Sequence, residues 1–166
     1  NIDNILELLG PEFIGAKWVI FFIGLAYLFD MLTGAYARQQ HASMLKEVHA
    51  NSKKQKTNYS ICTIDINGLK AINDKYGHEK GDSYLIHFSK QVQSFIAKSD
   101  FLSRTGGDEF VILFADSDTE GAYKIAERIL SAVRKQSFLR GPDKTYKLTI
   151  SIGIAEFPQD AGSGPA

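Results

Sequence analysis

Residues 101–114 read FLSRTGGDEFVILF, and this stretch decides the fold of the chain. Two short apolar segments, Phe101–Thr105 and Phe110–Phe114, flank a glycine-rich tip. Short strands on either side of such a tip are typical of a β-hairpin. Because a hairpin turn needs positive φ, we expect Gly106 and Gly107 to adopt it. The sequence therefore predicts two adjacent antiparallel strands whose connection ends in two acidic residues.

Regular elements lie on both sides of this hairpin. Tyr59–Ile66 is apolar and β-branched, which indicates a buried strand, and Tyr146–Phe157 alternates as a second long strand does. Helical patterns follow Gly81-Asp82-Ser83 and the N-cap candidates of Asp116–Thr119, and a short helical turn is expected at Leu69–Lys75. The order β-α-β-β-α-β is the ferredoxin-like or palm-type plan, an α+β sheet backed by helices.

Residues 1–29 differ from the rest, since they are apolar and sparsely charged. We expect an N-terminal helix or linker here, followed by a separate domain over residues 30–166. Trp18–Phe29 is apolar for about twelve residues, short of the roughly 20 needed to span a bilayer. Two interpretations stay open: residues 13–29 form the end of a membrane segment, or they form a buried or dimer-forming helix.

The beginning of the domain is polar. Asp30–Gly34 is typical of a helix stop followed by a turn, with Gly34 free to adopt positive φ. Arg38–Ala50 is expected to be a helix, and Asn51–Thr57 a lysine-rich surface loop. The apolar side of that helix carries Met44, Leu45 and Val48.

Composition sets limits on function. The 166-residue chain has a formal net charge of +0, which excludes a polycation that binds nucleic acid over its whole surface. A polyphosphate held through a metal ion needs no basic surface, because the metal supplies positive charge. The single cysteine, Cys62, lies in an apolar run, and we interpret it as a small buried residue.

Two acids stand where a sheet can hold a metal ion. Asp65 is at the end of the first predicted strand, and Asp108 is at the tip of the hairpin. If these strands are neighbours, the two carboxylates converge, and hard oxygen ligands suit Mg²⁺. The alternative is that Asp65 caps the next helix and Asp108 is an ordinary turn residue. Adjacent carboxylates at Asp108 and Glu109 favour the metal site, because they repel unless a cation compensates.

Several short motifs follow one another along the chain. They are DMLTG at 30–34 with Arg38, DINGLKAIND at 65–74, YGH at 76–78, GD at 81–82, Arg104 before the first glycine, GGDEF at 106–110, and SIGIA at 151–155. With these motifs in this order, the chain resembles the diguanylate cyclases of the GGDEF family from Asp30 to about Asp160.

The resemblance implies a set of residues for metal and phosphate. Asp65 and Asp108 are then the metal-binding carboxylates, assisted by the carbonyl of Ile66, and the metal is Mg²⁺ or Mn²⁺. Asp108 is also the position that accepts the proton of the attacking 3′-hydroxyl. Glu109 lies in the same site, and Lys70 neutralises charge on the phosphates in the transition state.

A second set of residues is implied for the nucleotide. Asn73 and Asp82 read the guanine edge, and a carboxylate that accepts from guanine N–H groups explains a preference for GTP over ATP. Gly106 and Gly107 let the phosphates lie against the hairpin. His78 lies beside the nucleotide, or else it is a packed loop histidine.

The chain departs from the family at several positions. Gly68 stands where an aromatic residue is common, which we interpret as loosening a phosphate-cradling loop. Ala97-Lys98-Ser99-Asp100 stands where the family has the R-x-x-D of its product-inhibition site. Without the arginine we expect no feedback inhibition there, since lysine lacks the planar fork that grips phosphate. We also expect the last helix of the family to be missing from residues 30–166.

The expected function is the condensation of two GTP molecules into cyclic di-GMP and pyrophosphate, in bacterial second-messenger signalling. The resemblance implies a two-fold homodimer, an upstream sensory domain and no nucleic-acid partner. It also implies a cytoplasmic catalytic domain, tethered to the inner face of the cell membrane if the N-terminal segment is a membrane helix. The alternatives are a catalytically silent domain that binds GTP or a protein partner as a regulator, and a structural or membrane-tethering module.

Overall fold

In the computed structural model of this chain, residues 24, 27–135 and 148–158 are described. The apolar helix predicted over residues 1–29 lies almost entirely outside these residues, and so do the first two positions of the strand predicted over 146–157. Within the described residues, no helix has both the length and the apolar character needed to cross a bilayer.

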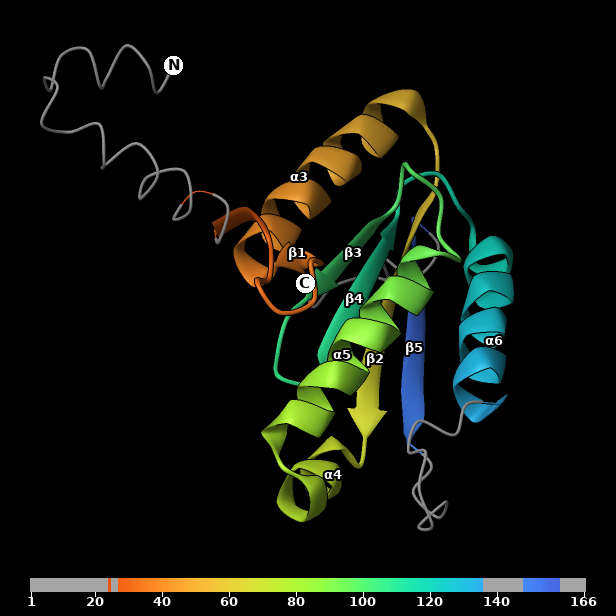
Figure 1. Cartoon of the computed structure of the whole chain (residues 1–166). Coiled ribbons are helices and arrows are strands. Elements are labelled where there is room, and N and C mark those ends of the chain that lie inside the picture. Colours follow the sequence, from red (N-terminus) through yellow and green to blue (C-terminus); the bar gives the residue numbers. More distant parts are fainter. Residues whose placement is uncertain (1–23, 25–26, 136–147, 159–166) are drawn as a thin grey trace, which may run out of the picture.

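A five-stranded sheet forms the centre of the described part of the chain (Figure 1). Its spatial order is β1-β3-β4-β2-β5, and all pairs are antiparallel except β1–β3. From β2 onward the elements follow the predicted β-α-β-β-α-β plan, which confirms the α+β fold; the short β1 was not predicted. The strands are β1 (Tyr36–Ala37), β2 (Tyr59–Asn67), β3 (Phe101–Arg104), β4 (Glu109–Phe114) and β5 (Thr149–Phe157).

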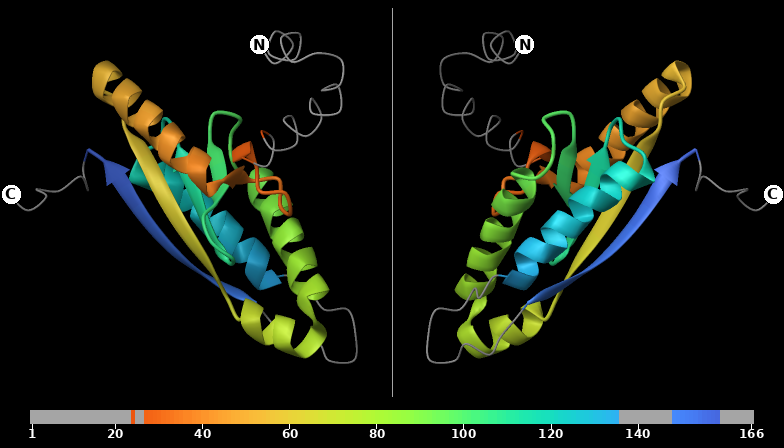
Figure 2. Two further views of the ribbon diagram at one scale, coloured as in Figure 1. Left: turned by 90° about the vertical axis from the view of Figure 1, so that its left-hand side faces the viewer. Right: turned by 90° about the vertical axis from the view of Figure 1, so that its right-hand side faces the viewer.

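Helices pack against both faces of the sheet (Figure 2). The helices α4 (Leu69–Tyr76), α5 (His78–Gln93) and α6 (Thr119–Lys135) enclose the main core, which includes Cys62 and Ile64 of β2. On the opposite face, α3 (Arg38–Gln55) packs through Val48 against Tyr59. Because α3 covers only the beginning of β2, the Asp65 end of that face is left exposed.

Helix α3 is longer than the sequence predicted. It runs from Arg38 to Gln55, so most of the segment expected to be a surface loop is helical. Ser52 in this extension is buried, so the last turns of α3 pack against the domain although their polar composition does not predict it. The helix ends at Lys56, whose left-handed backbone (φ 57°) lets its N–H bond to the carbonyl of Ser52.

Helix α5 begins earlier than predicted. Gly81 and Asp82 were expected to precede it, but the helix starts at His78, directly after Gly77. Gly77 has a φ of 85°, which only glycine adopts readily, and it turns the chain sharply from α4 into α5. Gly81 is therefore an internal helix residue with a packing role.

The beginning of α6 carries the predicted cap and one that the sequence did not indicate. The carboxylate of Asp118 accepts a hydrogen bond from the N–H of Gly121 at 2.8 Å, as an N-cap does. Glu156 of β5, which is buried, accepts from the N–H of Thr119 at 2.7 Å and from the side chain of Asn58 at 2.7 Å. The carboxylate of Glu156 thus links the residues at the starts of β2 and α6 to β5.

Candidate nucleotide and metal site

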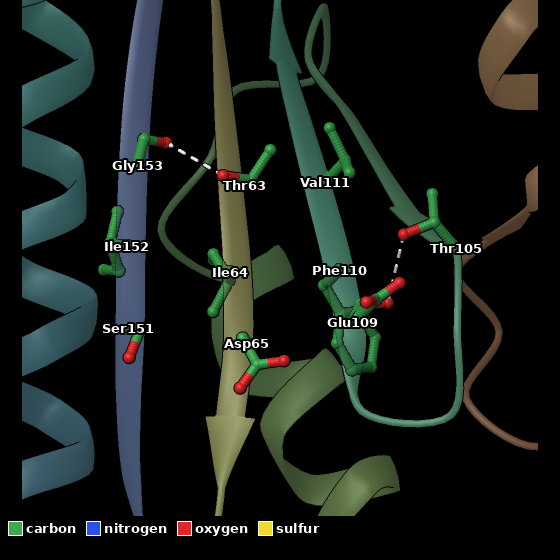
Figure 3. A pocket seen from close by; sticks show the side chains of 10 residues that line it. All are labelled: Thr63, Ile64, Asp65, Thr105, Glu109, Phe110, Val111, Ser151, Ile152 and Gly153. Carbon is green, nitrogen blue, oxygen red and sulfur yellow. Dashed lines mark hydrogen bonds between the residues drawn. The ribbon is translucent and has the colours of Figure 1, made fainter.

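A cavity of about 490 Å³ opens on the exposed face of the sheet, over β2, β4 and β5 (Figure 3). Side chains alternate along β2, so that Ile64 and Ile66 are buried while Thr63 and Asp65 are exposed. The register pairs Asp65 with Glu109 of β4, so both acids stand on this open face. Strand alternation and register alone therefore bring two carboxylates to one cavity.

The Asp65–Glu109 pair is unfavourable without a compensating charge. Like charges directly opposite on neighbouring antiparallel strands repel. Their oxygens are the hard ligands that Mg²⁺ or Mn²⁺ accepts, so the donor set fits such an ion. No cluster of three or more His, Cys, Asp or Glu side chains occurs among the described residues. Two carboxylates leave the remaining coordination positions to phosphate oxygens, water or a backbone carbonyl such as that of Ile66.

Asp108 lies one position before Glu109 and is half-buried. Its carbonyl accepts a hydrogen bond from the N–H of Ile66 at 3.1 Å, so the ladder continues one step beyond the Asp65–Glu109 pair. The predicted neighbourhood of Asp65 and the hairpin is therefore present. The acid that lines the cavity with Asp65 is Glu109, the first residue of β4, whereas Asp108, which precedes the strand, is not among the lining residues. The direct role of Asp108 as ligand and proton acceptor stays a prediction.

The glycine loop differs from the prediction in its backbone. Neither Gly106 nor Gly107 has φ in the left-handed region. The loop closes instead through the N–H of Thr105, which donates to the carbonyl of Glu109 at 3.0 Å. A Cβ on Gly106 would lie 2.6 Å from Oε2 of Glu109, whereas a Cβ on Gly107 would meet no atom within 4 Å. Gly106 therefore makes room for the Glu109 carboxylate.

Lys70 lies just after the junction of β2 and α4. It is exposed in the first turn of α4, which follows β2 after Gly68. Gly68 has a φ of 89° and sets the turn into the helix, and whether it loosens the loop stays a prediction. Lys70 is not among the residues that line the cavity, so its contact with phosphate also stays a prediction.

The contact between α4 and α5 contains a polar atom without a partner. Asn73 of α4 packs so closely on Gly81 that a Cβ there would lie 1.9 Å from its Oδ1. That oxygen is buried, and no described residue donates a hydrogen bond to it. Leaving a buried acceptor unsatisfied is costly, and the role of Asn73 at a guanine edge stays a prediction. Asp82, next to Gly81, adds an exposed carboxylate.

The exposure of His78 and the burial of Cys62 test what the sequence predicted for these two residues. His78 is exposed at the first position of α5, which contradicts the packed-loop alternative and leaves its place beside a nucleotide as a prediction. Cys62 is fully buried, and burial raises the pKa of its thiol to about 12, so it is the inert residue that the sequence predicted.

The segment of the expected product-inhibition site forms a small closed turn. The N–H of Ala97 donates to the carboxylate of Asp100 at 2.8 Å, and Lys98 is exposed. The absence of feedback inhibition at this place stays a prediction. The sequence did not indicate what Arg104 contacts. Its guanidinium donates hydrogen bonds to the carbonyls of Gly106 and Gly107 and to the carboxylate of Asp30.

Comparison with protein families gives a match over most of the chain. The family described as "Diguanylate cyclase, GGDEF domain" matches residues 27–165. An uncharacterized membrane protein of Staphylococcus epidermidis is 32% identical over 132 residues, which are 80% of this chain. The aligned part is 37% of that relative, so the chain spans little more than a third of its length.

Solved structures share the fold. The GGDEF domain of DgcB from Caulobacter crescentus, in complex with c-di-GMP, has a TM-score of 0.71 at 25% identity, covering 78% of this chain and 77% of that chain. An active GGEEF domain of a diguanylate cyclase from Vibrio cholerae has a TM-score of 0.61 at 31% identity, covering 66% of this chain and 69% of that chain.

Proposed function

Because this chain belongs to the GGDEF domain family of diguanylate cyclases, we propose that it condenses two GTP molecules into cyclic di-GMP with release of pyrophosphate. The observation that carries the proposal is the Asp65–Glu109 pair. The two acids face one cavity beside a closed glycine loop, where a cation and a polyphosphate relieve their repulsion.

The metal-binding role belongs to carboxylates of β2 and the hairpin. We assign Asp65, Asp108 and Glu109 as the acidic side chains that hold Mg²⁺ or Mn²⁺, with the carbonyl of Ile66 as a further oxygen donor. When bound, such an ion polarises the α-phosphate and stabilises the leaving pyrophosphate.

The chain's own residues orient the reactants. Gly106 and Gly107 present a hairpin tip without side chains, so phosphate oxygens approach the backbone closely. Lys70 places a positive charge near the phosphates as negative charge develops on them. Asp108 accepts the proton of the 3′-hydroxyl that attacks the α-phosphate of the second GTP.

The base is read at the contact of α4 and α5. The family resemblance assigns the side-chain amide of Asn73 to the guanine edge, which offers N–H groups at N1 and N2. The carboxylate of Asp82 accepts from the same edge, and His78 lies beside the nucleotide at the start of α5. Adenine presents no N1–H and no 2-amino group, so this arrangement favours GTP over ATP.

Two domains are needed for a cyclic product made from two identical halves. Each domain holds one GTP, and a two-fold homodimer brings the halves face to face. We further propose that a sensory domain precedes this one and that the domain works in the cytoplasm, tethered to the membrane through the segment before residue 30. The Staphylococcus relative is named a membrane protein, which supports the tether.

The test is cyclic di-GMP formation from GTP and Mg²⁺ by the full chain, compared with ATP as substrate. Asp108→Asn is expected to abolish product formation while GTP still binds. Glu120→Gln, which removes an exposed charge on α6, is the matched control and retains the wild-type rate. GTP binding without any product from the wild-type protein would contradict the proposal and favour a silent, regulatory domain.

A further inference from the structure

Arg104 connects the glycine loop to a distant turn of the chain. Its Nε donates to the carbonyls of Gly106 and Gly107, each at 3.2 Å, and its Nη2 donates to the carbonyl of Gly107 at 2.6 Å. Its Nη1 donates to both carboxylate oxygens of Asp30, at 3.1 and 3.3 Å. Every nitrogen of the guanidinium is engaged, so one planar group fixes the loop relative to Asp30.

Asp30 is itself held in a closed turn. Its carboxylate accepts from the N–H of Thr33 at 2.8 Å and from the hydroxyl of Thr33 at 2.6 Å. Its carbonyl accepts from the N–H of Gly34 at 2.8 Å. Burial acts to raise the pKa of Asp30, but the hydrogen bonds from Thr33 and the guanidinium of Arg104 outweigh it and lower the pKa. Asp30 therefore stays charged and anchored at neutral pH.

The same turn is attached to helix α5. The buried hydroxyl of Ser89 donates to the carbonyl of Thr33 at 3.1 Å, and both residues are buried. Helix α5 also carries Gly81 and Asp82. The turn 30–34 thus contacts the hairpin that holds the acids and the helix that contacts Asn73.

We propose that the turn 30–34 is a brace for the site, in which Asp30 and Arg104 are positioning residues that hold the glycine loop in the geometry that binds phosphate. The effect on turnover rests on the proposed function, whereas the effect on the loop does not.

An ion pair that merely stabilises the fold has different consequences. Losing a purely structural contact lowers the stability of the whole domain and speeds the opening of all protected amides together. Losing a brace loosens the loop selectively. It also lowers kcat more than it raises KM, because small misplacements weaken transition-state contacts first.

Two conservative variants of the full chain separate these cases. Arg104→Lys keeps the positive charge but loses the fork that joins both glycine carbonyls to Asp30. Asp30→Asn keeps the shape and an oxygen for Thr33 but removes the charge. Glu120→Gln, which removes the exposed ion pair with Lys124 on α6, is the matched control.

The first measurement is amide hydrogen exchange in the protein without nucleotide. The N–H groups of Thr105 and Gly106 donate to the carbonyl of Glu109 at 3.0 and 3.3 Å, so they report on loop closure. We expect Arg104→Lys to speed exchange at these two amides by about tenfold more than at the amides of the β2–β4 ladder, which report the loss of global stability. Unchanged loop exchange, or equal acceleration everywhere, would overturn the brace.

The second measurement is steady-state kinetics with GTP and Mg²⁺. We expect Arg104→Lys to lower kcat by about tenfold with KM changed by less than about threefold, and Asp30→Asn to do the same more weakly. A loss confined to KM would contradict the positioning role. If the wild-type protein makes no cyclic di-GMP, the proposed function fails, and the exchange data alone decide on the brace.

Discussion

The proposed nucleotide site has a phosphate end and a base end, which are built in different ways. At the phosphate end, the antiparallel ladder of β2 and β4 places Asp65 opposite Glu109, and backbone hydrogen bonds fix their separation. At the base end, two helices approach closely because Gly81 has no side chain in the way of Asn73. The first end depends on the carboxylates of Asp65 and Glu109, and the second depends on Gly81 having no side chain. Substitutions should therefore change chemistry at the ladder and geometry at the helices.

The largest effect is expected from Asp65→Asn at the ladder. We expect cyclic di-GMP formation to fall by about a thousandfold, the scale on which losing a preorganised electrostatic contact acts. Without metal the variant should be more stable than the wild type by about 0.2–1 kcal/mol, because the cross-strand repulsion with Glu109 is removed. Activity assays and thermal unfolding in EDTA check both parts. A variant that is less stable in EDTA would contradict the unpaired-charge interpretation.

The next effect is expected from Gly81→Ala at the helices. An added Cβ would lie 1.9 Å from Oδ1 of Asn73, so the asparagine must move. We expect the affinity for GTP to fall by about tenfold to a hundredfold, equivalent to about 1.4–2.7 kcal/mol. Calorimetric titration with a non-hydrolysable GTP analogue measures it. Glu120→Gln, which removes an exposed charge on α6, is the control and should leave the affinity unchanged.

A smaller effect is expected from pH at the brace that joins the two ends. The folded pKa of Asp30 lies below its unfolded value, so its stabilising contribution is present above about pH 4 and is lost as the pH falls through the folded pKa. Asp30→Asn should therefore lower stability at pH 7 by about 1 kcal/mol. Denaturant titrations of both proteins should converge at acid pH. A gap that stays constant down to pH 3 would mean that the charge of Asp30 is not involved.

The smallest effect is expected outside both regions. Lys124 and Glu120 form an exposed ion pair on α6, at 2.6 Å. Solvent and salt screen such pairs, so Lys124→Gln should leave stability and turnover unchanged. Thermal unfolding at low and high salt tests this. A clear loss of turnover would show that α6 takes part in the site and that the comparison of two ends is incomplete.

The sequence predicted the elements well but not their register. The apolar, β-branched run Tyr59–Ile66 predicted a strand and the glycine tip predicted a hairpin, and the described sheet has both. The sequence left open whether that strand and the hairpin are neighbours, and the β2–β4 pairing shows that they are. Whether Asp108 or Glu109 shares a face with Asp65 depends on register, and a shift of one residue exchanges the faces. No local pattern encodes that choice, because Asp108 and Glu109 have the same chemical character.

Long-range polar contacts were also beyond a reading of the sequence. Arg104 and Asp30 are 74 residues apart, and Glu156 reaches Asn58 across 98 residues. Such partners become neighbours only through the sheet order. The glycines illustrate the same limit: Gly34 has the expected positive φ, whereas Gly81 is required by a side chain from another helix.

The position of the turn 30–34 has a practical consequence for protein engineering. Chimaeras that place another domain before this one need a junction, and the residue chosen decides whether the turn 30–34 is kept. Phe29 still stacks on Tyr36, with ring centroids 5.0 Å apart, so splicing at or before Phe29 preserves the turn together with its aromatic support. Splicing at Tyr36 would keep the residues of all five strands but remove Asp30, the carboxylate that pairs with Arg104, and Ala35 of the core.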